Sequence, residues 1–130
     1  MTHLAVTPRA IFAAFLSCVF LAAALFSVTA CHSYHIDTTI ENRTGADIQP
    51  LEVDYPSASF GADRIASGAV YHYRFQVNGS GPLKITYTAA DGKQVQIAGP
   101  TLVEHQQGQL KIVLLPSGKA QFLPQLTASN

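Results

Sequence analysis

The feature that most constrains the fold of this 130-residue chain is a hydrophobic period of two in its last hundred residues. Every second side chain is apolar in YHYRFQV at 71–77, and the same alternation runs through YHIDTTI at 34–40 and LKITYT at 83–88. Because side chains alternate between the two faces of a strand, each segment is predicted to be a strand with one face on a core. LKIVLL at 110–115 is apolar on nearly both faces, which predicts an interior strand.

Two turn sequences fix how the predicted strands pair. ADGK ends at Lys93 and PSGK ends at Lys119, and each carries glycine in its third position. A three-residue loop with a left-handed glycine pairs Ala89 with Lys93 and Leu115 with Lys119. A two-residue loop would move every following side chain to the opposite face of the sheet. The cross-strand pairs expected from the three-residue loops are Tyr87–Val95, Ile85–Ile97, Leu114–Ala120 and Ile112–Phe122.

The predicted fold is all-β. Short strands separated by turn signals indicate a single immunoglobulin-like β-sandwich of about seven antiparallel strands, with a small β-barrel as the alternative. The tryptophan and disulfide of antibody domains are absent, so only the architecture is implied. The strands are expected at residues 34–41, 47–54, 69–77, 82–89, 94–98, 109–115 and 120–125.

The first thirty residues have a different pattern and predict a targeting segment. Arg9 is the only charged side chain before Asp37, and an unbroken apolar run occupies residues 11–28. A basic start, an apolar middle and small residues at the end are typical of a secretory signal peptide, here a signal helix at residues 1–30. The run is also long enough to span a membrane, so an uncleaved anchor is the alternative.

Cys31 follows this segment directly. The letters VTAC resemble the lipobox of bacterial lipoproteins, in which the chain is cut before the cysteine, here between Ala30 and Cys31, after lipid is attached to the thiol. The resemblance implies a membrane-anchored lipoprotein of the bacterial cell envelope that faces the periplasm or the exterior. Residues 31–33 would form a very short tether to a β-sandwich domain at residues 34–130. Plain cleavage at the same bond, without lipid, is the alternative.

The numbers of cysteines and of charged residues limit which bonds and partners the mature chain can have. Cys18 lies in the apolar run and would leave with it, so the mature chain keeps one cysteine and cannot form an internal disulfide. Removing Arg9 from the 8 basic residues leaves 7 against 8 acidic ones, a balance that does not favour a nucleic-acid partner. Cys31, His32 and His35 could be metal ligands, but an extended chain sends the two histidines to opposite faces. No metal and no cofactor is therefore predicted.

Two long connections, at residues 54–68 and 98–108, are candidates for recognition, because long loops are often functional. The alternative interpretation is that Phe60 and Ile65 hold the first loop against the core. An enzyme is not expected, since no G-x-S-x-G nucleophile motif is present. The alternative function is a metal-handling or hydrolytic protein that uses His105, Glu104 and the region of Asp54. The candidate recognition residues are Asp54, Tyr55, Ser57, Ser59, Asp63, Arg64, Glu104 and His105.

Two smaller patterns have alternative interpretations. The aromatic row Tyr71, Tyr73 and Phe75 is predicted to face the core, although an outward row could bind carbohydrate. Asn42 and Asn78 each begin an N-x-[ST] pattern, which marks a glycosylation candidate in a eukaryotic secreted protein. In a bacterial host both are predicted to be turn asparagines.

Three stretches, IENRTGADIQPLEVDYPSASFG, YHYRFQVNGSGPLKITYTAADGK and GPTLVEHQQGQLKIVLLPSGKAQFLPQL, resemble a family of small bacterial envelope proteins with lipoprotein-type leaders. The resemblance extends from Ile36 to Leu126 and implies no particular activity. Together with the lipobox it favours a noncatalytic binding or structural module, held at the membrane through lipidated Cys31 and recognising a protein or glycan partner.

Overall fold

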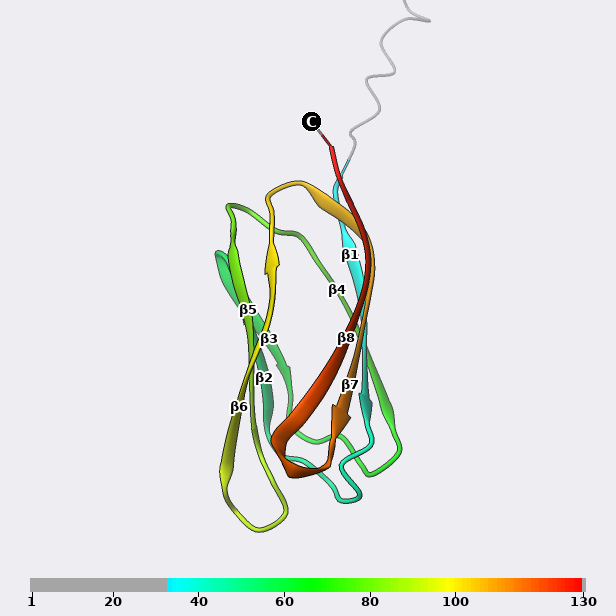
Figure 1. Cartoon of the computed structure of the whole chain (residues 1–130), viewed down its shortest axis with the longest axis vertical. Coiled ribbons are helices and arrows are strands. Elements are labelled where there is room, and N and C mark those ends of the chain that lie inside the picture. Colours follow the sequence, from blue (N-terminus) through cyan, green and yellow to red (C-terminus); the bar gives the residue numbers. More distant parts are fainter. Residues whose placement is uncertain (1–32, 130) are drawn as a thin grey trace, which may run out of the picture. The chain divides into compact units, whose positions relative to one another are not determined.

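Eight strands form two four-stranded sheets that pack against each other (Figure 1). The computed structural model describes residues 33–129, so the predicted signal helix, the cleavage site at Ala30 and Cys31, and the lipid attachment at Cys31 lie outside the described residues. The order of strands is β4-β1-β7-β8 in one sheet and β3-β2-β5-β6 in the other. The strands are β1 Ile36–Asn42, β2 Leu51–Tyr55, β3 Ala58–Ala62, β4 Val70–Phe75, β5 Gly81–Thr88, β6 Gln94–Leu102, β7 Gln106–Leu115 and β8 Lys119–Ala128.

The prediction of an all-β sandwich is confirmed, since the described chain forms two separate sheets and not a closed barrel. The core lies between the sheets and is built from the apolar positions of the alternating segments. β7 is an interior strand, as its apolar sequence predicts, with β1 on one side and β8 on the other. Within residues 33–129 no helix is long and apolar enough to cross a membrane. The fully buried side chains include Ile36, Ile40, Val53, Leu83, Ile85, Leu110, Ile112 and Leu114.

The predicted register of both glycine hairpins is confirmed. Tyr87 lies opposite Val95 across the β5–β6 hairpin, and Ile112 lies opposite Phe122 across β7 and β8. Gly92 adopts a φ of 81°, in the left-handed region where glycine has no side chain to clash. Local turn chemistry therefore sets the face that each of these strands presents to the core.

Three details differ from the sequence prediction. An eighth strand, β3, occupies the first connection, which was expected to be irregular. β6 continues through Gly99 and Pro100, so the second connection shortens to residues 103–105. Pro100 is tolerated because β6 is at the edge of its sheet, where a missing N–H need not break a ladder. β1 and β7 pair in parallel, whereas every other strand pair is antiparallel.

The strands connect two ends of the sandwich that carry different loops (Figure 1). The described chain begins at what we call the entry end, where the Glu104 backbone N–H donates to Ser80 Oγ over 3.2 Å. β8 also finishes there, because Ala128 pairs with Gln106 at the start of β7. The entry end consists of residues 33–35, 56–57, 76–80 and 103–105. The opposite end, called the far end, consists of residues 43–50, 63–69, 89–93 and 116–118.

Thr38 gives a direct test of core energetics. Its side chain is 1% exposed on the inner face of β1, and its hydroxyl has no hydrogen-bond partner within residues 33–129. An unpaired buried hydroxyl costs about 1–3 kcal/mol, so the Thr38→Val substitution, which keeps the shape, should raise the free energy of unfolding by about 1 kcal/mol. Urea unfolding of the domain measures it, with Thr39→Val on the outer face as the control. A loss of stability in Thr38→Val would contradict the unpaired state.

Candidate functional site

The structure separates the candidate recognition residues between the two ends of the sandwich. Asp54, Tyr55, Ser57 and Ser59 belong to the β2–β3 hairpin, whose turn is at the entry end. Asp63 and Arg64 follow β3 and lie at the far end, where Ile65 bridges to Ile48. Glu104 and His105 form the β6–β7 turn at the entry end. The eight residues therefore do not form one site.

At the β2–β3 hairpin, two of the predicted residues, Asp54 and Tyr55, have structural partners. Asp54 Oδ2 lies 3.0 Å from Lys84 Nζ on the neighbouring strand β5. The ring of Tyr55 packs against Phe75 with centroids 4.5 Å apart, and burial raises the pKa of its hydroxyl above 10.0. Phe60 and Ile65 are both buried, which confirms that they hold this segment to the core.

Glu104 and His105 remain a local pair at the β6–β7 turn. The His105 Nε2 and Glu104 Oε1 atoms are 3.9 Å apart, and both side chains are about half exposed. The His105 ring packs on Tyr34, with centroids 5.0 Å apart. Within residues 33–129, Asp54 makes no hydrogen bond or ion pair to this pair, and no group of three His, Cys, Asp or Glu residues could hold a metal ion. The proposed C-H-x-x-H cluster includes Cys31 and His32, which lie outside the described residues.

The aromatic row of β4 was predicted to face the core, and this holds fully only for Phe75, because Tyr71 is partly buried and Tyr73 is exposed. Phe75 is buried, whereas Tyr73 is 39% exposed and stacks on Phe60 of β3 with centroids 4.2 Å apart. The Tyr71 hydroxyl donates to the Gly61 carbonyl over 2.9 Å. These contacts join β4 and β3, which are edge strands of the two sheets. The main role of the aromatic row is therefore to hold the two sheets together along that side.

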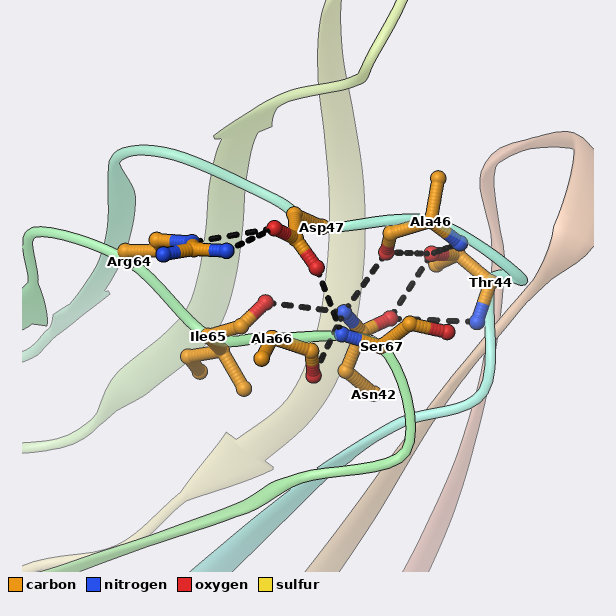
Figure 2. Close-up of polar contacts among 8 residues, drawn as sticks. All are labelled: Asn42, Thr44, Ala46, Asp47, Arg64, Ile65, Ala66 and Ser67. Carbon is orange, nitrogen blue, oxygen red and sulfur yellow. Dashed lines mark hydrogen bonds and ion pairs between the residues drawn. The ribbon is translucent and has the colours of Figure 1, made fainter.

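A buried asparagine organises the far end (Figure 2). Asn42, at the end of β1, is completely buried, and its side-chain N–H groups donate to the carbonyls of Ala46, Ile65 and Ala66 over 2.8–3.2 Å. Its Oδ1 accepts from the backbone N–H of Thr44 over 3.1 Å. The first N-x-[ST] pattern is therefore a hydrogen-bond hub, with its amide unavailable for glycosylation in the folded domain. From the sequence alone, Asn42 was predicted only to be a turn asparagine.

Asp47 makes the second connection across the same two loops (Figure 2). Its Oδ1 accepts from the Ser67 backbone N–H over 2.9 Å, and its Oδ2 accepts from Arg64. The Ser67 hydrogen bond, followed by that from Arg64, lowers the pKa of the Asp47 carboxyl below its ordinary 3.8. Arg64, predicted to be a recognition residue, therefore has a structural partner from the β1–β2 loop.

A pocket of about 440 Å³ opens at the far end, where the β1–β2 loop, the β5–β6 turn and the β7–β8 turn meet. Its lining is mainly apolar and includes Ile48, Val95 and Leu115. Tyr87 also lines the pocket although its side chain belongs to the core, with 3% of the residue exposed. Burial raises the pKa of the Tyr87 hydroxyl above 10.0, so the group is neutral at physiological pH. Sequence analysis missed this pocket, because its lining comes from separate segments that share no motif.

The comparisons with known proteins concern the fold. No protein-family model matches this chain, and no curated protein sequence matches it either. Among solved structures it is similar to the NMR structure of a protein from Eubacterium rectale, with a TM-score of 0.51 and 13% sequence identity. The match covers 70% of this chain and 88% of that chain. At this identity the likeness carries no information on activity.

Because Asn42 is a hydrogen-bond hub and Asn78 is not, we expect alanine substitutions at these two asparagines to change the free energy of unfolding very differently. Asn42→Ala leaves several buried backbone groups without partners and should lower the free energy of unfolding by about 2–4 kcal/mol. Asn78→Ala, in the exposed β4–β5 loop, should change it by less than about 0.5 kcal/mol. Urea unfolding of the domain compares them, and equal effects would show that the Asn42 network contributes nothing specific.

The lowered pKa of Asp47 predicts that the domain loses stability at acidic pH. Because its folded pKa is lowered, its stabilising contribution is complete above the unfolded pKa near 3.8 and is lost as the pH falls toward the folded value. The urea midpoint of the wild-type domain should therefore fall between about pH 5 and pH 3, and Asp47→Asn should flatten that fall. Asp63→Asn is the matched control, because Asp63 makes no ion pair within residues 33–129. Identical acid profiles for wild type and Asp47→Asn would contradict the linkage.

Proposed function

We propose that this chain is a lipid-anchored protein of the bacterial cell envelope whose β-sandwich is a noncatalytic binding or structural module. The observation that carries the proposal is the closeness of Cys31 to the sandwich. Only His32 separates Cys31 from Ser33, the first described residue, and β1 begins at Ile36. A mature chain starting at a lipidated Cys31 would hold the entry end beside the bilayer, because no long tether intervenes.

With the entry end held at the bilayer in this way, the far end would face the periplasm or the exterior. β1 runs from the entry end, where the described chain begins, to the far end, so its last residue Asn42 lies at the end of the strand opposite to Ser33 (Figure 1). Two or more acyl chains anchor a protein stably, whereas one binds reversibly. We expect the partner, a protein or a glycan, to approach from that side.

The positions of the candidate catalytic groups support a noncatalytic role. The Glu104–His105 pair lies at the entry end, where the described chain begins, and the carboxylate of Asp54 is held by Lys84. A hydrolytic site needs its acid, base and nucleophile within hydrogen-bond reach of one reacting atom. The alternative function would have to assemble these groups from separate places on the domain.

Intact mass spectrometry of the protein from its host's membrane fraction tests the anchor. We expect a chain that starts at Cys31 and carries diacylglycerol and a fatty acid. Cys31→Ala should lack this lipid, whereas Cys18→Ala, which changes the other cysteine, should keep it. A mass that retains residues 1–30 would indicate an uncleaved anchor, and an unmodified Cys31 would indicate plain cleavage. A transition metal in the native mass that is lost in His105→Ala would contradict the noncatalytic module.

A further inference from the structure

The far-end pocket contains a polar group that the fold itself does not use. Tyr87 is only 3% exposed, yet its hydroxyl makes no hydrogen bond within residues 33–129. Among these residues, Thr38 Oγ1 is the only buried side-chain oxygen that is both unpartnered and sealed from solvent. The Tyr87 hydroxyl must therefore reach solvent, and the pocket that Tyr87 lines is where it can do so.

The rest of the pocket lining is mainly apolar and comes from both sheets. Val95 of β6, Leu115 of β7 and Ile48 of the β1–β2 loop all line it. The β7–β8 turn packs closely on β6, since a Cβ on Gly118 would lie 3.2 Å from Val95 Cγ1. The volume of about 440 Å³ is in the range of small-molecule sites, which combine apolar walls with a few polar groups.

Charge at the rim selects the class of ligand. Lys93 and Asp91 both line the opening, and their Nζ and Oδ2 atoms are 3.9 Å apart. Because the two charges are opposite and adjacent, they give the pocket no net attraction for an ion. A neutral ligand with an apolar body and one hydroxyl or carbonyl group would satisfy the Tyr87 hydroxyl without burying a charge.

We propose that the far-end pocket binds a small, neutral, mainly apolar molecule whose single hydroxyl or carbonyl pairs with the hydroxyl of Tyr87. This inference rests on the proposed function of a noncatalytic binding module and names its ligand chemistry. The site is at the end opposite the proposed anchor, so a ligand would reach it from the aqueous side.

Two probes that differ by one hydroxyl test the proposal, namely p-cresol and toluene. The full chain, purified from the membrane fraction and reconstituted in lipid nanodiscs, is titrated with each probe at measured free concentration. Amide hydrogen exchange followed by mass spectrometry reports protection of residues 84–95 and 112–120, which contribute the pocket. We expect p-cresol to protect both segments with an affinity about threefold to tenfold above that of toluene.

Three variants separate the pocket from other effects. Tyr87→Phe keeps the ring and removes the hydroxyl, so it should bind both probes equally. Ala90→Trp fills the pocket from an exposed rim position and should abolish protection, whereas Ala58→Trp, an exposed alanine at the other end, should bind as wild type does.

The proposal is overturned if neither probe protects the far end, or if Tyr87→Phe retains the preference for p-cresol. Protection of the same segments in host membranes that the probes cannot reproduce would assign the pocket to a macromolecular partner and would also overturn it. The proposed anchor is tested separately, by intact mass. An unmodified Cys31 with intact p-cresol binding would overturn the anchor proposal alone. A lipidated chain that binds neither probe would overturn the ligand proposal alone.

Discussion

The buried carboxamide of Asn42 is the interaction on which the far end of this sandwich depends. One side chain satisfies three carbonyls and one backbone N–H, drawn from the β1–β2 and β3–β4 loops. Loops normally run over the surface because their backbone groups need water, but here a completely buried asparagine replaces that water. The two loops can then pack tightly enough for Ile48 to enter the core and form one wall of the pocket.

Sequence alone predicted the parts of the fold that are determined locally. Alternation placed strands around Tyr73 and Ile85, and the glycine of each x-x-Gly-Lys turn fixed hairpin register to the residue. β3 was missed because ASFGA has one large apolar residue, Phe60, and weak β-propensity otherwise. The end of β6 was missed because glycine and proline signal a break. There Gly99 is needed for packing instead, since a Cβ would lie 2.8 Å from Leu83 Cδ2.

The candidate site was less predictable, because its contacts join segments that are distant in sequence. Arg64 was predicted to be a recognition residue because it is a charged side chain in a long connection. Its partner Asp47 lies 17 positions away on another loop. Tyr87 was correctly paired with Val95 across a hairpin, but no local pattern reveals that its hydroxyl lacks a partner. That property depends on three connections meeting at one end of the sandwich. Residue type therefore identified polar positions in the loops. Only the tertiary arrangement showed which polar side chains are paired within the fold and which can bind a ligand.

The distribution of charge explains why recognition is expected at a pocket and not across the sheets. Six of the seven lysine and arginine side chains in residues 33–129 lie within 4 Å of a carboxylate. On the outer face of β1, Asp37 pairs with Arg74 through two hydrogen bonds of 2.7 and 3.1 Å. Such exposed pairs contribute little stability, but they neutralise each other and leave weak fields for steering a charged partner. The Tyr87 hydroxyl differs because it has no partner within the described domain and opens to the pocket, so a ligand that supplies a hydrogen bond there gains specificity that the paired surface charges do not offer.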